Sequence, residues 1–342
     1  MNSLNVSIII PTYNYAEYIQ EAINSVLKQN YENGKIEIIV VDDGSTDNTC
    51  EVLKDMINNG TIQYYCQENK GKAYATYVGI QKSTGKYVFN LDADDYYLEN
   101  KIINTVNIFE ADTSIVHVAS PAKYFYQETQ ATSIEKIPSD ILGKTVEGNW
   151  LLQYFYSNNI LFGGGSTYAA RASVLKMIKI PDTVDMFIDE FLILAVLPFG
   201  KSHFLEQPLS IWRVHKRNYS GNNLSREKQI QKEQRLLNSS EAVFAYIQEN
   251  DYDKKLKKIY HLKYLTHKIT FYEILKKKTN REVFKYAFEV FFIIRPTWKL
   301  LTKYFVVNRL IPSNIFRLLK KVMIIGYISK CICPYDNWIT AC

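Results

Sequence analysis

Two hydrophobic segments in the N-terminal third of the chain each run directly into a cluster of aspartates. The first is residues 38–43, IIVVDD, and the second is residues 87–95, YVFNLDADD. An apolar run that ends in acids is typical of a buried parallel strand, whose carboxyl end lies at the sheet edge where α/β proteins bind ligands. Crowded carboxylates repel one another unless a positive group joins them, and a hard divalent cation is a common partner. The pattern therefore predicts a sheet edge that holds a metal ion and an anionic ligand such as a diphosphate.

The rest of the N-terminal half alternates between strand and helix patterns. We expect strands at residues 6–10, 36–41, 62–66, 87–91 and 115–118, with helices at 19–27, 45–56 and 71–83 between them. Further along, we expect a helix at 187–197, strands at 202–205 and 209–214, and helices from residue 224 onward. Alternation at this rhythm predicts a mostly parallel α/β sheet flanked by helices, followed by a C-terminal α-helical region.

Charge is distributed unevenly along the 342 residues. Residues 225–342 carry 23 Lys and Arg against 10 Asp and Glu, whereas the preceding residues carry 18 against 25. This shift, together with the polar stretch SGNN at 220–223, predicts a catalytic domain at residues 1–222 and a basic, aromatic helical region at 223–342. An acidic first domain suits a cation site, and a basic second region suits an anionic surface.

Several observations favour a cytoplasmic location. The N-terminus lacks a basic segment followed by an apolar stretch, and no window approaches 18 uninterrupted apolar residues. The five cysteines form no CxxC framework, and an odd number of cysteines without a signal peptide favours a reducing compartment.

Four short motifs occur in order: VSIIIPTYN at 6–14, VDDGSTD at 41–47, NKG at 69–71 and DADD at 92–95. Together they resemble the signature of family 2 glycosyltransferases with the GT-A fold, and the resemblance covers roughly residues 5–220. It implies inverting transfer of a sugar from a nucleotide-diphosphate donor, with Mn²⁺ or Mg²⁺ as cofactor. Negative charge grows on the leaving diphosphate in such a reaction, and a divalent cation stabilises it.

The resemblance also implies roles for individual residues. Asp94 is the expected metal ligand, and Asp92 is expected to contact the ribose or to orient the site. Asp43 is expected to accept a hydrogen bond from uracil N3. The other expected donor-binding residues are Pro11, Thr12 and Tyr13 at the nucleotide base, and Asn69, Lys70 and Gly71 near the phosphates. For Asp95, capping of the next helix and support of a metal-bound water both stay open.

An acidic pair at the start of the 187–197 helix is the candidate for the catalytic base. Asp189 and Glu190 resemble the pair beneath the family's acceptor site, but the usual order there is Glu-Asp. Alignment favours Glu190, while Asp189 serves if the helix start shifts by one residue. A base must reach the acceptor hydroxyl at hydrogen-bond distance, so geometry decides between them.

A second late motif, Arg213-Val214-His215, resembles the Arg-x-His element of such transferases. The two polar residues alternate with apolar ones, so they share one face of a strand. We expect Arg213 at the donor and His215 at the metal. Residues 163–167, GGGST, either line the donor or acceptor pocket or form a simple turn.

Aromatic and basic residues interleave through residues 284–322. Basic amphipathic helices with interfacial aromatics suit an anionic membrane surface, beside a lipid-linked acceptor; an ordinary helical bundle is the alternative. A homo-oligomer is also left open. Nucleic acid is not expected as a partner, because no binding motif accompanies the charge.

The expected function is that of a glycosyltransferase acting on a glycan or lipid-linked acceptor in surface polysaccharide biosynthesis. A nucleotidyltransferase is the nearest enzyme alternative, but it would show a glycine-rich basic loop where residues 11–14 read PTYN. A non-catalytic nucleotide-sugar-binding module is the alternative from another class. The sequence indicates neither the sugar nor the acceptor.

Overall fold

The computed structural model describes residues 5–158, 160–216, 225–275, 285 and 289. Contacts between Cα atoms divide the chain into two compact units, residues 1–257 and 258–342. Every strand of the described residues belongs to the first unit. The expected boundary between domains at residue 222 stays a prediction.

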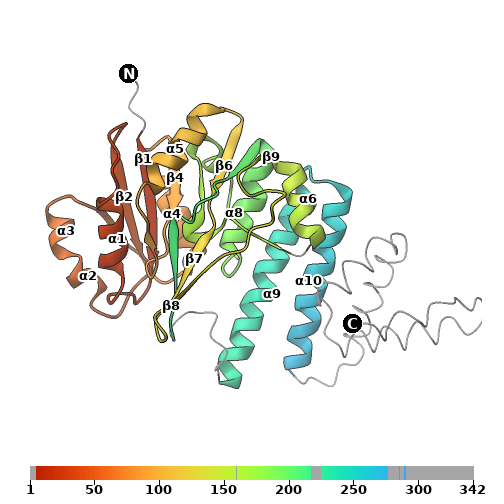
Figure 1. The fold of residues 1–342 in the computed structure, drawn as a ribbon. Helices are drawn as coiled ribbons and strands as arrows, with labels where there is room; N and C mark the ends of the chain where they lie inside the picture. Colours follow the sequence, from red (N-terminus) through yellow and green to blue (C-terminus); the bar gives the residue numbers. More distant parts are fainter. Residues whose placement is uncertain (1–4, 159, 217–224, 276–284, 286–288, 290–342) are drawn as a thin grey trace, which may run out of the picture. The chain divides into compact units, whose positions relative to one another are not determined.

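The strands form two sheets (Figure 1). The order in the larger sheet is β3 (Gln63–Cys66), β2 (Ile36–Asp42), β1 (Val6–Thr12), β4 (Tyr87–Asn90), β10 (Ala169–Arg171), β6 (Ile115–Ala119), β11 (Lys201–Phe204) and β9 (Thr145–Glu147). The order in the smaller sheet is β5 (Tyr96–Tyr97), β12 (Ser210–Val214), β7 (Ala122–Tyr126) and β8 (Ala131–Ile134). Strands β3, β2, β1 and β4 are parallel, as are β6 and β11, whereas β10 is antiparallel to both of its neighbours.

Along the described chain, helices α1 to α8 lie between strands, and α9 and α10 follow the last strand. They are α1 (Ile19–Leu27), α2 (Thr49–Val52), α3 (Lys54–Asn58), α4 (Lys72–Lys82), α5 (Lys101–Ala111), α6 (Gly148–Asn158), α7 (Ala172–Leu175), α8 (Ile188–Val196), α9 (Arg226–Glu249) and α10 (Lys254–Ile274), with short 3₁₀ turns η1 (Gly165–Thr167) and η2 (Leu197–Phe199). The predicted fold class, a mostly parallel α/β sheet flanked by helices and followed by helical sequence, is confirmed.

Both faces of the parallel strands are covered, because successive side chains of a strand point to opposite faces. Ile8 and Val40 pack in one core cluster with apolar residues of α1 and α5. Ile39 and Val41 pack in another cluster with Ala75 of α4. Burial on both sides explains why these strands read as continuous apolar runs rather than alternating ones.

Helix α4 approaches β1 so closely that a glycine is required between them. A Cβ atom built on Gly79 would lie 2.3 Å from Cγ2 of Ile9. Since α4 begins at the carboxyl edge of the sheet, this packing fixes where its first residue, Lys72, stands relative to the aspartates after β4.

The expected helix at 45–56 begins later than the sequence suggested. Asn14 Oδ1 accepts hydrogen bonds from the backbone N–H groups of Thr46 (2.7 Å) and Asp47 (3.2 Å), and Asn14 N–H donates to Ser45 Oγ (2.8 Å). Residues that resemble a helix start therefore join the loop after β2 to the loop after β1. The helical part follows as the two short segments α2 and α3.

The smaller sheet brings late residues to the aspartates that follow β4. Strand β5 comes directly after those aspartates and pairs antiparallel with β12, with Ser210 opposite Tyr97. Strand β12 also pairs in parallel with β7, so that Trp212 is opposite Tyr124. Residues more than a hundred positions apart in the chain thereby meet at one edge.

Helix α9 fixes the loop that precedes α8. Ser239 Oγ accepts hydrogen bonds from the backbone N–H groups of Asp185 and Met186, both at 3.0 Å. Arg235 forms an ion pair with Asp185. These contacts hold the start of α8, which carries the acidic pair, in a defined position.

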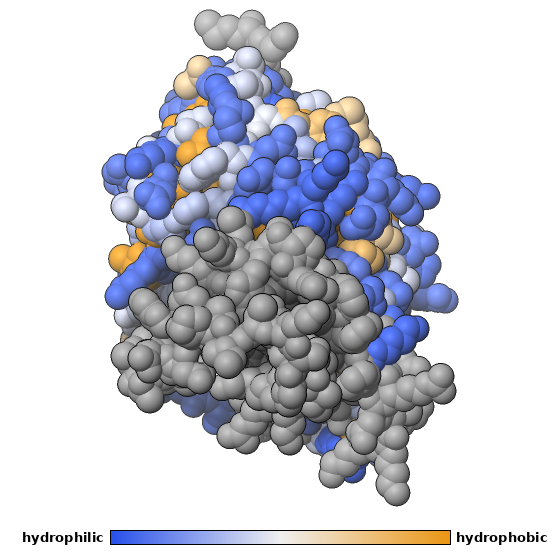
Figure 2. All heavy atoms as spheres, turned by 90° about the vertical axis from the view of Figure 1, so that its right-hand side faces the viewer, coloured by the Kyte–Doolittle hydropathy of each residue, from blue (hydrophilic) through white to orange (hydrophobic). Residues whose placement is uncertain are grey.

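Within the described part of the chain, no helix is long and apolar enough to cross a membrane. The described surface visible in Figure 2 is mainly hydrophilic, with small separate apolar areas. The segment 284–322, for which the sequence predicts interfacial helices, lies outside the described residues except for Lys285 and Glu289.

A candidate active site

The second aspartate cluster forms a turn at the carboxyl end of β4. The backbone N–H of Asp95 donates to the carbonyl of Asp92 (3.0 Å), which ends the strand and lets alternate side chains converge. One carboxylate oxygen from each of Asp92, Asp94 and Asp95 lies within 4.8 Å of the others. We call these three residues the acidic turn. Oxygen ligands at this spacing fit a hard divalent cation.

Asp95 anchors the acidic turn to two other elements. Its Oδ2 accepts a hydrogen bond from Ser166 Oγ (2.6 Å), and its Oδ1 accepts one from the backbone N–H of Arg213 (2.9 Å). Burial, together with the charges of Asp92 and Asp94, raises the pKa of Asp95 well above its ordinary value. With both oxygens bonded inside the protein, Asp95 supports the site rather than capping a helix.

Asp94 lies beside a histidine and two tyrosines. Nε2 of His215 lies 3.1 Å from Oδ2 of Asp94, and the His215 ring packs against Tyr15 and Tyr18. Burial and then the charges of Asp94 and Asp92 raise the pKa of Tyr15, so its hydroxyl stays protonated and able to donate. The predicted metal ligands Asp94 and His215 are thus brought together, although their coordination stays a prediction.

Lys72 joins the acidic turn to α8. Its Nζ lies 2.8 Å from Asp92 and 3.3 Å from Oδ2 of Asp189. Although burial lowers the pKa of Lys72, the charges of Asp189 and Asp92 raise it above its ordinary value, so the ammonium stays charged. Burial raises the pKa of Asp92 to about 6, although the positive charge of Lys72 lowers it. The negative charges of Asp189 and Asp94 add to the rise.

Sequence reasoning missed Lys72 and assigned the phosphate-binding cation to Lys70. Lys70 is exposed, and its Nζ lies 4.8 Å from the centre of the Tyr74 ring. Lys72 is the first residue of α4, at the same sheet edge as Asp92. Its place at the start of a helix on that edge is the sequence feature that could have identified it. The role predicted for Lys70 at the donor phosphates stays a prediction.

The two candidate bases differ sharply in their surroundings. Asp189 lines the cavity described below, and its Oδ1 is buried without a hydrogen-bond partner among the described residues. Glu190 is buried, accepts a hydrogen bond from the hydroxyl of Tyr156 (2.6 Å), and does not line the cavity. Of the two candidates, Asp189 lines the cavity, and which of them is the base stays a prediction.

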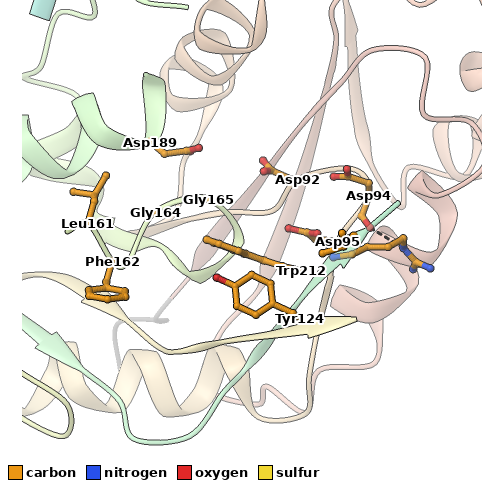
Figure 3. Close-up of a pocket in the computed structure, with 13 residues that line it drawn as sticks. Asp92, Asp94, Asp95, Tyr124, Leu161, Phe162, Gly164, Gly165, Asp189 and Trp212 are labelled. Atoms are coloured by element: carbon orange, nitrogen blue, oxygen red, sulfur yellow. Dashed lines mark hydrogen bonds between the residues drawn. The ribbon is translucent and has the colours of Figure 1, made fainter. Parts of the chain in front are cut away.

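A cavity of about 520 Å³ lies beside these groups (Figure 3). Its lining consists of Asp92, Asp94, Asp95, Tyr124, Leu161, Phe162, Gly163, Gly164, Gly165, Asp189, Trp212, Arg213 and Val214. A cavity of this size with a few converging polar groups is typical of a small-molecule site. The glycines expected at a pocket or a turn serve both purposes, since residues 163–165 line the cavity and lead into η1.

Arg213 holds the cavity wall together. Its Nε donates to the carbonyl of Asp94 (2.9 Å), and its guanidinium pairs with Glu21 and lies 5.0 Å from the centre of the Tyr18 ring. Arg213 therefore fixes the backbone of the acidic turn. Its predicted contact with the donor stays a prediction.

The first aspartate cluster lies at the same sheet edge but does not line the cavity. Asp43 Oδ1 accepts a hydrogen bond from the backbone N–H of Lys70 (2.8 Å), and its Oδ2 accepts one from the N–H of Gly71 (2.7 Å). Gln67 also donates to Asp43 Oδ1 (2.8 Å). Asp43 thus fixes the loop that leads into α4, and its predicted bond to a nucleotide base stays a prediction.

The remaining predicted donor residues surround this loop. Pro11 and Thr12 are buried at the end of β1, while Tyr13 and Asn69 are exposed. None of these four lines the cavity. They form a separate part of the sheet edge. This part lies next to the acidic turn because β1 pairs with β4.

Comparison with known proteins places this arrangement among sugar-transferring enzymes. The model of glycosyl transferase family 2 matches residues 7–177. The chain is 30% identical over 223 residues to an uncharacterized glycosyltransferase of Nostoc sp., covering 62% of this chain and 65% of that protein. It is 34% identical over 155 residues to glycosyltransferase GlyG of Streptococcus pneumoniae, covering 42% of this chain and 51% of that protein. The match therefore spans only part of each of these relatives.

Among solved structures, Staphylococcus aureus TarS residues 1–349 in complex with UDP-GlcNAc superposes with a TM-score of 0.58 at 19% identity. The superposition covers 93% of this chain and 85% of the other. A second crystal structure of TarS gives a TM-score of 0.57 at 18% identity, with 50% of that chain covered. At this identity the similarity bears on the fold, and it confirms the expected architecture.

Proposed function

The chain belongs to glycosyl transferase family 2, and we propose that it moves a sugar from a nucleotide-diphosphate donor to a hydroxyl group of a glycan or lipid-linked acceptor, with inversion at the anomeric carbon. The observation that carries this proposal is the position of Asp189. Its carboxylate lines the same cavity as the acidic turn and is tied to it by Lys72. A base and a site for diphosphate thus share one cavity.

In the proposed reaction Asp189 takes the proton of the acceptor hydroxyl. The acceptor oxygen forms a bond to the anomeric carbon while the bond from that carbon to the diphosphate oxygen breaks on the opposite face. Asp189 lines the cavity, and Lys72 holds its carboxylate in place through Oδ2. This geometry supports Asp189 rather than Glu190 as the general base.

The residues that would hold a divalent cation are Asp94, with Asp92 and His215 beside it. They fit, because carboxylate oxygens and imidazole suit Mn²⁺, and carboxylates suit Mg²⁺. When bound, the cation would neutralise charge on the departing diphosphate. Asp95 contributes by holding the turn, since both of its oxygens are bonded to Ser166 and Arg213.

We further propose that the donor carries UDP. The TarS structure that shares the fold contains UDP-GlcNAc, so UDP-N-acetylglucosamine is the first donor to test. The proposed setting is surface polysaccharide biosynthesis at the cytoplasmic side of a membrane. That setting rests on the family and on the basic composition of residues 225–342.

The test is a panel of UDP-, GDP- and dTDP-sugars incubated with the full chain, with Mn²⁺, with Mg²⁺ or with EDTA. Thermal shift reports binding, because a ligand stabilises the folded state that it binds. Nucleotide release reports turnover. The proposal expects one donor class to raise the unfolding temperature and to be turned over only with a divalent cation. Binding without hydrolysis or transfer to any acceptor would instead support a non-catalytic binding module.

A further inference from the structure

Lys101, the first residue of α5, is a fully buried lysine that binds only to neutral acceptors. Its Nζ donates to the carbonyl oxygen of Thr167 (2.9 Å) and lies 3.4 Å from Ser120 Oγ. Burial of the charged form is unfavourable, and it lowers the pKa of Lys101 to about 7. An apolar side chain of the same length, such as methionine, would avoid this cost, so stability alone does not account for an amine at this position.

The carbonyl group that Lys101 binds belongs to η1, and η1 also binds the acidic turn. Ser166 directly precedes Thr167 and is fully buried. Its Oγ donates to Oδ2 of Asp95 (2.6 Å) and accepts from the backbone N–H of Asp92 (3.0 Å). One hydroxyl group thus contacts both ends of the acidic turn, and the position of that hydroxyl depends on where η1 lies.

Contacts from outside fix η1, because the segment that leads into it is rich in glycine. Gly163, Gly164 and Gly165 have no side chains that could hold the backbone. Nε2 of His117 lies 3.1 Å from the carbonyl oxygen of Gly163 and carries the proton of this hydrogen bond, because a carbonyl only accepts. His117 therefore holds the first end of the segment 163–167, and Lys101 holds the last.

The acidic turn and η1 are joined at two points. Asp95 and Lys101 are close in the sequence, with β5 between them, and both bind η1. At Gly165, a Cβ atom would lie 3.7 Å from Oδ2 of Asp92, so η1 also packs against that carboxylate (Figure 3). A displacement of η1 would therefore move the groups that hold the acidic turn.

We propose that Lys101 is a positioning residue for the divalent cation at the acidic turn. Its amine holds the carbonyl of Thr167 and thereby fixes Ser166. Ser166 in turn holds the backbone of Asp92 and the carboxylate of Asp95, so that the three carboxylates of the turn converge. This inference rests on the proposed function, because it concerns the cation site of that function.

The test is isothermal titration calorimetry of the full chain with Mn²⁺ alone, after treatment with EDTA and its removal. Lys101→Met keeps the length of the side chain and removes the donor. Ser210 Oγ still donates to the carbonyl of Ser166 (2.6 Å), so η1 should loosen without being released. We expect Mn²⁺ to bind about three- to tenfold more weakly, the range that the loss of one internal hydrogen bond predicts.

The sign of the change separates positioning from charge. Removing a positive group near a cation site strengthens cation binding if charge alone acts, because like charges repel. Positioning predicts weaker binding. Lys101→Leu is a second apolar variant that should give the same direction, so the test does not depend on the folding of Lys101→Met.

A double-mutant cycle with Ser166→Ala tests the route through Ser166. Ser166→Ala alone should weaken Mn²⁺ binding about tenfold, since it leaves Oδ2 of Asp95 without this hydrogen bond. If Lys101 acts through Ser166, the double variant should bind Mn²⁺ within about twofold of Ser166→Ala. Losses that multiply in the double variant would overturn this route.

Lys176→Met is the matched control. Lys176 is exposed, and its Nζ also donates to a backbone carbonyl, that of Ser83 (2.6 Å), outside η1 and the acidic turn. We expect its Mn²⁺ affinity to stay within about twofold of the wild type, as for most surface substitutions. Unfolding temperatures show whether each variant is folded.

The outcomes separate this inference from the proposed function. If the wild type binds no divalent cation, the proposed cation site fails and the role of Lys101 fails with it. If the wild type binds Mn²⁺ but Lys101→Met and Lys101→Leu bind it equally well or more tightly, only the role of Lys101 is wrong.

Discussion

The ammonium group of Lys72 lies 3.3 Å from the carboxylate of Asp189, a residue 117 positions further along the chain. This ion pair joins the first turn of α4 to the first turn of α8. Lys72 also pairs with Asp92, so one cation holds the candidate base and the acidic turn at a fixed separation.

Asp189→Asn should lower kcat for sugar transfer by about 10²- to 10⁴-fold, the range that general-base catalysis supplies. The KM for the donor should change little. Glu190→Gln is the control, because an amide oxygen can still accept the bond from Tyr156. Steady-state kinetics with both variants decides between the two bases. A larger loss in Glu190→Gln than in Asp189→Asn would assign the base to Glu190.

Asp94→Asn should weaken binding of Mn²⁺ at least tenfold, because it replaces a charged oxygen ligand with a neutral amide. Isothermal titration calorimetry of the protein with Mn²⁺ alone measures this without any assay of activity. Glu128→Gln serves as the control, since Glu128 is an exposed carboxylate that forms an ion pair with Lys216 outside the acidic turn. Unchanged Mn²⁺ affinity in Asp94→Asn would refute the metal assignment.

Lys72→Met should lower both stability and kcat, because it leaves the carboxylates of Asp92 and Asp189 facing each other without a cation. The side chain of Lys72 is 35% exposed, so we expect a loss of about 1–3 kcal/mol rather than the larger value of a fully buried pair. Urea unfolding measures the first effect. The exposed Lys70→Met should stay within about 0.5 kcal/mol of the wild type, as most surface substitutions do; a similar loss in both variants would contradict a specific role for Lys72.

Gly71→Ala should destabilise the protein more than Gly60→Ala does. Both glycines have positive φ, +91° and +73°, where a side chain introduces strain of about 1–2 kcal/mol. A Cβ atom at Gly60 meets nothing within 4 Å, whereas one at Gly71 would lie 2.5 Å from Oδ1 of Asp185, which Arg235 holds in place. Equal losses of unfolding free energy would show that Asp185 moves away freely.

Acid should destabilise the protein through His117. Burial lowers the pKa of His117 from its ordinary 6.5 to about 4. Between these values the unfolded chain binds a proton that the folded chain does not, so stability falls as pH decreases from 6.5 toward 4, by up to about 3 kcal/mol.

The test of this expectation is His117→Asn. The variant should be less stable at pH 7.5, because it loses packing and a hydrogen bond to Gly163, but its stability should fall less between pH 6.5 and pH 4.5. Urea unfolding at four pH values gives both curves. Parallel curves for the wild type and the variant would exclude His117 as the source of the acid sensitivity.

Much of the fold could be predicted from the sequence, because the relevant signals are local. The apolar runs of β1, β2 and β4 lie where the pattern indicated, and helices α4 and α8 begin within one residue of the expected positions. The main departure was the helix expected at 45–56. Ser45 and Thr46 have the chemistry of a helix start, but Asn14, which is far away in the sequence, bonds to both.

The site residues that could not be identified from the sequence were missed for one common reason. Lys72 and Tyr15 belong to no pattern at their own positions, and each acts through a contact across the fold. Ser166 lies in the segment 163–167 that the sequence predicted at a pocket or a turn, but its own role also depends on such a contact. Ser166, for example, accepts from the backbone of Asp92 and donates to Asp95 only because η1 lies against the end of β4.

The sequence alone determined that apolar strands would deliver aspartates to one sheet edge, since strand burial and turn chemistry are properties of short segments. Tertiary structure decided which carboxylates face the cavity. Asp189 and Glu190 are adjacent on α8, and neighbouring residues of a helix point about 100° apart. The rotation of α8 about its own axis, set by its packing against the rest of the unit, therefore directs Asp189 to the cavity and Glu190 to Tyr156.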